Sequence, residues 1–112
     1  MARNKLLQTP PYPVTQTLLR LGEDLRTARV RRRFTINEVA QKIGTGRRAV
    51  MDAENGKPST GIAVYAALLW VYDLLSPLAD VANPTKDEQG LIFAAAKDKK
   101  RVRKTGDLDN DF

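Results

Sequence analysis

The 112-residue sequence predicts an all-α protein with one small domain and an extension at each end. Apolar residues recur every three or four positions over residues 14–28 and again over 36–53, as they do along one face of an α-helix. A third stretch, residues 62–72, carries no charge at all. These patterns divide the chain into an irregular arm at 1–13, a helical domain at 14–82, and a C-terminal helix with a charged tail at 83–112.

The first helix is predicted to begin at Val14 and to last about five turns. Prolines at positions 10, 11 and 13 precede it and favour an irregular arm, because proline blocks helical hydrogen bonding. The helix then carries one apolar stripe with four- and three-residue spacing, made by Val14, Leu18, Leu21, Leu25 and Ala28. Arg31–Arg33 close it with cations, which the negative end of the helix dipole favours.

The second helix is predicted to start at a capping box, in which Thr35 and Glu38 satisfy free backbone N–H groups. Its inner face is apolar at positions i, i+3, i+4 and i+7, namely Ile36, Val39, Ala40 and Ile43. Gly44 follows at once and tolerates the positive φ of a tight turn.

The third helix is predicted from about Gly46 to Glu54, where Asn55-Gly56 ends it. Val50 and Ala53 provide its inward face. Two short helices with this apolar spacing, joined by a three-residue turn, are typical of a helix-turn-helix. In that motif the first turn of the second helix meets base edges in the major groove, and here that turn carries Arg47 and Arg48.

The fourth predicted helix, residues 61–75, is apolar on every side between Ile62 and Tyr72. A helix of this kind must be covered on every side, which so small a domain cannot do alone. One stripe is expected to face the core: Ile62, Tyr65, Leu69 and Tyr72. A second stripe is expected to form a homodimer interface: Ala63, Ala67, Trp70 and Leu74. The alternative is that the C-terminal helices cover that second stripe.

The C-terminal part is expected to contain a short helical segment at 78–82 and a helix at 90–97. Thr85 and Glu88 fit a second capping box ahead of the latter. Residues 97–104 then hold six cations and one anion, a net charge of +5, and three acids follow at 107–112. We expect this tail to be mobile in isolation and either to order on a partner protein, to contact DNA phosphates, or to be inert.

Composition narrows the class of protein. The net charge of +6 favours polyanionic partners such as DNA, RNA or an anionic membrane surface. The chain has no cysteine and no histidine, so zinc sites of the usual kind, Cys–His pairs and Ser–His–Asp triads are excluded. We therefore expect no enzyme activity, no metal and no cofactor. No signal peptide is visible and the uncharged stretch is too short to span a bilayer, which predicts a soluble cytoplasmic protein.

Residues 18–75 resemble the Xre/Cro-type helix-turn-helix family. The resemblance rests on three groups: Leu21-Gly22-Glu23, Leu25 and Arg29; Phe34-Thr35, Glu38-Val39-Ala40 and Gly44; and Arg47, Val50 and Glu54-Asn55-Gly56-Lys57. It implies a five-helix, lambda-repressor-like domain that binds double-stranded DNA at a palindromic operator as a dimer, usually as a transcriptional repressor. It also implies a structural ion pair between Arg29 and Glu54.

A narrower resemblance covers residues 73 onward and is to HipB-type proteins, the DNA-binding antitoxin partners of HipA-like serine/threonine kinase toxins. It rests on Asp73-Leu74-Leu75, Leu78-Ala79-Asp80, Asp87, Gly90-Leu91 and the basic run Lys99–Arg103. The resemblance implies an autoregulatory antitoxin. The alternative is a stand-alone regulator without a toxin partner.

The candidate DNA-binding residues divide by chemistry. Arg47 and Arg48 are expected to read bases, since arginine pairs bidentately with guanine, and Met51 to touch a thymine methyl group. Hydroxyl, amide and ammonium groups nearby are expected to bind phosphates: Thr35, Asn55, Lys57 and Ser59. Three positions depart from the family: Ile36 replaces a frequent glutamine, Gly46 replaces a capping serine, and Asp52 would be repelled by phosphate. RNA binding stays an alternative from charge alone.

Overall fold

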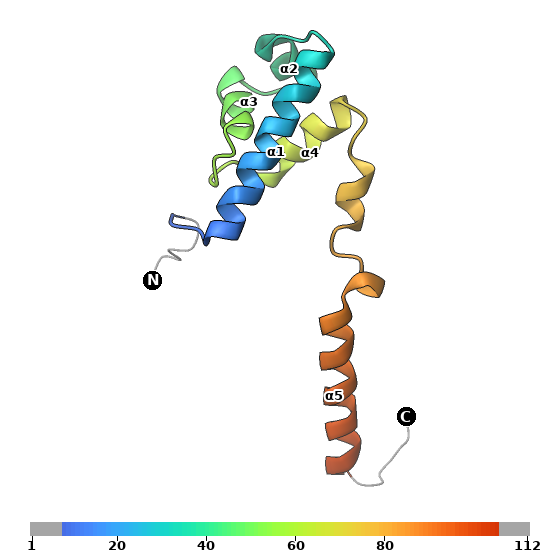
Figure 1. Ribbon diagram of the computed structural model, residues 1–112. Helices are drawn as coiled ribbons and strands as arrows, with labels where there is room; N and C mark the ends of the chain where they lie inside the picture. Colours follow the sequence, from blue (N-terminus) through green and yellow to red (C-terminus); the bar gives the residue numbers. More distant parts are fainter. Residues whose placement is uncertain (1–7, 106–112) are drawn as a thin grey trace. The chain divides into compact units, whose positions relative to one another are not determined.

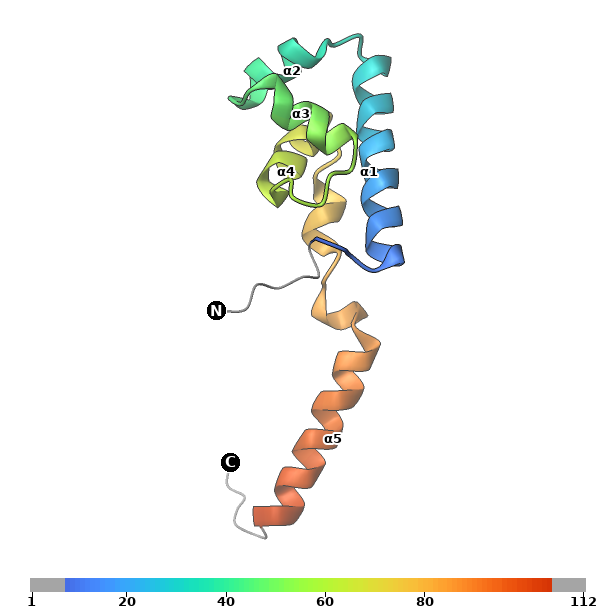
Figure 2. The ribbon, with the colours of Figure 1, turned by 90° about the vertical axis from the view of Figure 1, so that its left-hand side faces the viewer.

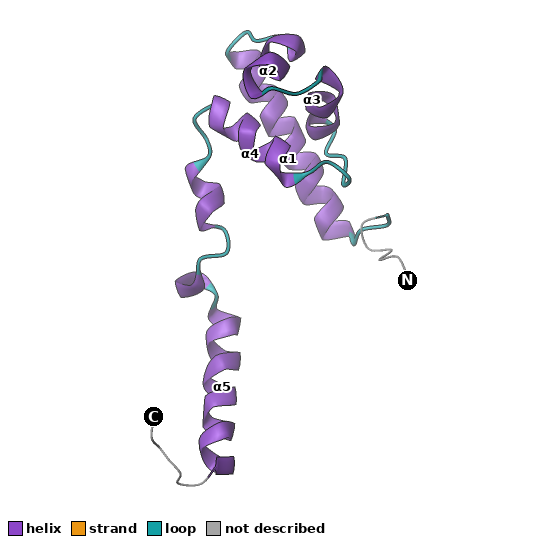
Figure 3. Ribbon diagram, turned by 180° about the vertical axis from the view of Figure 1, so that it is seen from behind, coloured by secondary structure: helices purple, strands orange, loops and turns teal. Residues whose placement is uncertain are grey.

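The computed structural model describes residues 8–105, and these are all-helical, as the sequence predicts (Figures 1 and 3). The elements in chain order are α1 (Tyr12–Arg31), α2 (Ile36–Ile43), α3 (Arg47–Glu54), α4 (Ile62–Val71), the 3₁₀ helices η1 (Ser76–Asp80) and η2 (Pro84–Lys86), and α5 (Glu88–Thr105). The chain divides between Ser76 and Pro77 into two compact units, α1–α4 and the part that follows. The expected domain end at residue 82 therefore lies within the second unit.

The first unit is built around α3, which contacts each of the other three helices. Figure 2 shows α1 along one side of α2, α3 and α4. The core contains only apolar side chains and the two tyrosines of α4 and its C-terminal end: Leu25, Ala28, Val39, Ala40, Val50, Ala53, Tyr65, Leu68 and Tyr72. Burying one face of each helix is what stabilises helices as short as α2 and α3, which would be marginal alone.

The N-terminus of α1 lies two residues earlier than expected. The helix begins at Tyr12, after Pro11 as its N-cap, and includes Pro13 in its first turn. Proline costs no hydrogen bond there, because the first N–H groups of a helix have no internal acceptor. The prediction of an irregular arm to residue 13 is therefore wrong at its end, and residues 1–7 of that arm lie outside the described residues.

The start of α2 confirms the predicted capping box. The Thr35 hydroxyl accepts a hydrogen bond from the Glu38 backbone N–H at 3.0 Å, and the Glu38 carboxylate accepts one from the Thr35 N–H at 2.7 Å. Gly44 ends α2 with a φ of 74°, the left-handed conformation expected of this turn. Gly46 then precedes α3 without any side-chain cap.

The buried face of α4 differs from the predicted stripe. Tyr65, Leu68 and Tyr72 are buried, whereas Ile62 is 67% exposed and Leu69 only half-buried. At about 100° per residue, Ile62 lies roughly 90° away from the centre of the buried face. Leu69 packs against the edge of the core, as expected. The choice of Ile62 over Leu68 was wrong because an apolar helix has no polar side to mark its orientation.

The second unit corrects two expectations about the C-terminal part. The capping box at Thr85 is absent: the Asn83 carboxamide caps η2, and the Asp87 carboxylate accepts the Gly90 N–H at 2.9 Å at the start of α5. The predicted helix 90–97 is also too short, since α5 continues to Thr105 through the basic run. Lysine and arginine are good helix formers, which explains the continuation.

Two glycines allow α1 to lie against the end of α3. A Cβ atom on Gly22 would lie 2.5 Å from the Glu54 carbonyl oxygen and 2.7 Å from that of Ala53. Gly56 has a φ of 66°, and a Cβ atom on it would lie 2.6 Å from the Leu18 carbonyl oxygen. These distances are shorter than real carbon–oxygen contacts, so a side chain at either position would separate the two helices.

Gly22→Ala is expected to lower the free energy of unfolding by about 2 kcal/mol, although alanine is the better helix former. The reason is the clash with two backbone carbonyl groups, which cannot move as a side chain can. Urea unfolding followed by circular dichroism measures the change. Gly61→Ala is the control without a clash, because nothing lies within 4 Å of a Cβ atom there; as the N-cap of α4, it is expected to lose only about 1 kcal/mol or less. Equal stability of the two variants would contradict the close approach.

Candidate nucleic-acid interface

The outward face of α3 carries most of the candidate base-reading residues. Val50 and Ala53 point into the core and are fully buried. At about 100° per residue, Arg48 and Asn55 lie nearly opposite them, with Met51 beside them. Arg48 and Asn55 are exposed and Met51 is half-buried. Arg47 is exposed on the flank of the same helix. The fold thus leaves these side chains free to meet a ligand.

A partly buried ion pair holds the C-terminal end of α3 against α1. Arg29 donates to the Glu54 carboxylate through Nε at 2.6 Å and through Nη2 at 3.0 Å, and through Nη1 to the Phe34 carbonyl oxygen at 3.0 Å. The two side chains are only 12% and 7% exposed. Hydrogen bonding to Glu54 raises the pKa of Arg29, so the guanidinium keeps its charge at any working pH. The pair expected from the family resemblance is therefore present.

Arg32 has a structural function that the sequence did not reveal. Its guanidinium donates to the Ala28 and Tyr72 carbonyl oxygens, both at 2.9 Å, and lies 5.3 Å from the centroid of the Tyr72 ring. It therefore joins the end of α1 to the end of α4. Burial raises the pKa of Tyr72 to about 12, so its phenol stays neutral. Of the basic run at 31–33, the middle arginine is thus engaged in structure.

The candidate phosphate-binding residues fall in two places. Asn55, Lys57 and Ser59 are exposed in and after the end of α3, in the segment that leads to α4. Thr35 is exposed at the start of α2, where its hydroxyl already caps that helix. A capping hydroxyl that accepts a hydrogen bond can still donate one, so this structural function leaves a phosphate contact open.

Asp52 brings two of the candidate cations together. Its carboxylate lies 3.8 Å from Arg48 Nε, one turn earlier on α3, and 3.8 Å from Lys57 Nζ beyond the end of the helix. The Asp52 side chain is 26% exposed, compared with 79% for Arg48 and 53% for Lys57. Sequence reasoning identified Asp52 only as a departure from the family and missed this cluster, although the Arg48–Asp52 spacing of four residues predicts the first contact.

The expected dimer surface on α4 is partly continuous. Ala63 and Trp70 lie opposite the buried face; both are exposed, Trp70 by 66%, and Ala67 is half-buried. Trp70 lines an open hollow of about 490 Å³ with Lys42 and Val71. These residues leave an apolar surface centred on the tryptophan.

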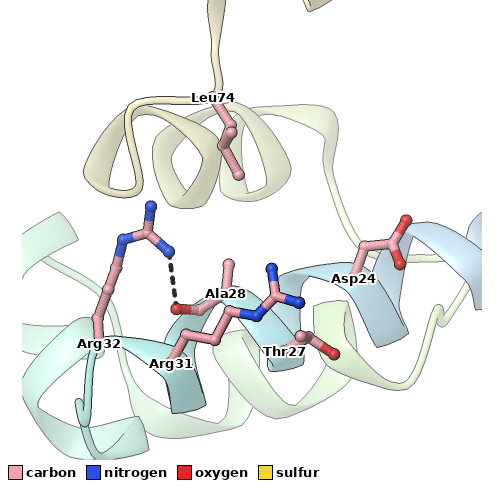
Figure 4. A pocket seen from close by; sticks show the side chains of 6 residues that line it. All are labelled: Asp24, Thr27, Ala28, Arg31, Arg32 and Leu74. Carbon is pink, nitrogen blue, oxygen red and sulfur yellow. Dashed lines mark hydrogen bonds between the residues drawn. The ribbon is translucent and has the colours of Figure 1, made fainter.

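Leu74 does not continue the Trp70 stripe. The helix ends at Val71, and Asp73 has a φ of 60°, which redirects the chain. Leu74 instead points toward α1 across a hollow of about 300 Å³ (Figure 4). The other lining residues come from that helix and its C-cap: Asp24, Thr27, Ala28, Arg31 and Arg32. Leu74 is still 46% exposed, so a partner could contact it from a direction other than that of the Trp70 surface.

Comparisons with known proteins give no match: no family model, curated protein or solved structure matches this chain. No helix within residues 8–105 has the length and apolar character that a membrane span requires. Among the same residues, acidic side chains form no group of three or more that could hold a metal ion.

Proposed function

We propose that this protein is a sequence-specific DNA-binding transcriptional repressor, in which α2 and α3 form a lambda-repressor-like helix-turn-helix and α3 enters the major groove. The observation that carries the proposal is the outward face of α3. The helix is short, is held from behind by the buried core and the Arg29–Glu54 pair, and presents Arg48, 79% exposed, at the centre of this face. Rigid placement of a few polar side chains is what base reading requires.

The contacts divide into reading and positioning. Arg47 and Arg48 suit guanine O6 and N7, and Met51 suits a thymine methyl group. Thr35, Asn55, Lys57 and Ser59 suit phosphates on either side, which set the register of α3 in the groove. The absence of a side-chain cap at Gly46 leaves the N–H groups at the start of α3 available to a phosphate oxygen as well. Such a protein acts on cytoplasmic DNA.

The exposed apolar surface of α4 supports a homodimer. Trp70 is 66% exposed on a helix that carries no charged residue, and exposing so large an apolar side chain to water is unfavourable. The same surface of a second copy of the protein would cover it. Two-fold symmetry would then present two α3 helices to half-sites about one helical turn apart on a palindromic operator.

A second candidate function, the antitoxin of a HipA-like kinase toxin, is favoured by α5. Leu91, Ile92 and Phe93 are exposed by 56%, 66% and 66%, and the basic run follows them in the same helix. Three exposed apolar side chains in a row suit a protein surface better than DNA phosphates, which offer nothing apolar. The two functions are compatible, since an antitoxin of this kind represses its own operon.

Replacing Arg48 or Arg47 with alanine is expected to weaken binding to a preferred operator by about 1–3 kcal/mol for a bidentate base contact. Lys57→Ala should weaken specific and non-specific binding alike and reduce the salt slope, since it removes a phosphate contact. Fluorescence anisotropy with the protein's own promoter fragment measures both. Arg26→Ala, an exposed arginine of α1, is the control. Unchanged operator affinity in the Arg47/Arg48 double variant would refute the assignment of α3 as the reading helix.

Trp70→Glu is expected to dissociate the dimer while the helical content stays unchanged, because it places two unpaired charges at an apolar seam. Analytical ultracentrifugation at micromolar concentration measures the mass, and circular dichroism measures the helix content. Val30→Glu tests a different exposed apolar residue, 55% exposed on α1, and should leave the dimer intact. A wild-type protein that is already monomeric at this concentration rules out the dimer.

Truncation after Ala96 separates the two proposed uses of the basic run. Loss of kinase binding with preserved operator affinity is expected if α5 contacts a toxin. Loss of DNA affinity with a shallower salt dependence is expected if the run contacts phosphates. Truncation after Gly106 keeps the basic run and removes the acidic end, and so isolates the contribution of the cations. If neither truncation alters either measurement, both uses are wrong.

A further inference from the structure

Asp52 is an acidic residue on the outward face of α3, where the neighbouring cations Arg48 and Lys57 would attract a polyanion. Counting about 100° per residue, it lies beside Arg48 and Asn55 on the outward face of α3, away from Val50 and Ala53. Its carboxylate is 3.8 Å from Arg48 Nε and 3.8 Å from Lys57 Nζ, and no closer hydrogen bond holds it among the residues of α3 and its flanks. It is therefore poised between two cations and bound tightly to neither.

The local physical chemistry of α3 does not favour an acid at this position. Asp52 lies in the last turn of the eight-residue helix, where the negative end of the helix dipole repels a carboxylate. The Arg48–Asp52 pair also has the less favourable order, with the cation N-terminal to the anion. Since Arg48 is 79% exposed, solvent screens the pair, and its contribution to folding is small. Stability therefore gives no reason for Asp52.

The charge on the outward face of α3 gives a reason for an acid at position 52. In the free protein, Asp52 partly neutralises Arg48 and Lys57, so that these two cations attract phosphates of any sequence less strongly. In a major groove, a carboxylate can accept a hydrogen bond only from an amino group, which cytosine offers at N4 and adenine at N6. Every other base edge at that place presents an acceptor or a methyl group and leaves the carboxylate unpaired.

We propose that Asp52 is a specificity-determining residue: it accepts a hydrogen bond from a base amino group next to the base read by Arg48, and it suppresses binding to all other sequences. This inference rests on the proposed function. It assigns the acid to discrimination between sequences, with a cost in total affinity, because a negative charge facing DNA penalises non-specific complexes most.

The test compares Asp52→Ala, which removes both the charge and the hydrogen-bond acceptor, with wild type on two probes. One is the duplex of about 25 base pairs that wild type enriches most from a random pool, and the other is poly(dI-dC). Asp24→Ala is the matched control, since it removes an exposed acid on α1 and changes the net charge from +6 to +7 in the same way. Anisotropy titrations over a range of salt give affinities and salt slopes, and circular dichroism confirms that both variants are folded.

Asp52→Ala is expected to bind poly(dI-dC) roughly three- to fivefold more tightly than either wild type or Asp24→Ala, with a steeper salt slope. Its preference for the enriched duplex should fall about tenfold or more, and the sequences that it enriches should vary at the cytosine or adenine position. Identical behaviour of the two variants, or an equal loss on both probes, would overturn the assignment of Asp52. If wild type enriches no duplex, the proposed function itself fails, and the two failures are thus distinguishable.

Discussion

The contact between the middle of α1 and the end of α3 is the constraint on which the rest of the first unit depends. Gly22 lets the backbone carbonyls of Ala53 and Glu54 approach α1 to within a distance that no side chain would allow. Arg29 then reaches Glu54 with two hydrogen bonds and the Phe34 carbonyl with a third. Because one guanidinium joins α1, the end of α3 and the segment before α2, the position of α3 is fixed relative to both of its neighbours.

This constraint decides which side of α3 is available. Its inward residues are buried against α1, α2 and α4. The side-chain carboxylate of Glu54, at its C-terminal end, is paired with Arg29. Only the opposite side remains, with Arg48, Met51, Asp52 and Asn55. A helix of eight residues has no stability of its own, so a fixed outward surface on it exists only because its other side is anchored. The proposed DNA-reading surface is therefore a consequence of how the core is packed.

The cations of the first unit have different tasks despite their common charge. Arg29 and Arg32 hold helices together through backbone and carboxylate acceptors, and Lys42 lies 4.9 Å from the centroid of the Phe34 ring. Arg47 is exposed, and Arg48 is screened only by the acid one turn later. A net charge of +6 is thus a poor guide to a polyanion surface, since part of it is committed to structure.

The sequence by itself determined the helices whose ends carry local signals. The capping box at Thr35, the positive φ at Gly44 and the stop at Asn55-Gly56 act through neighbouring backbone groups, so their effect can be predicted without the fold. Tertiary structure alone decided the orientation of α4, because an apolar helix has no polar side that distinguishes Ile62 from Leu68. It also decided the structural use of Arg32 and the direction of Leu74, since each depends on an element distant in sequence. The sequence around a residue carries no signal of which distant element will pack against it.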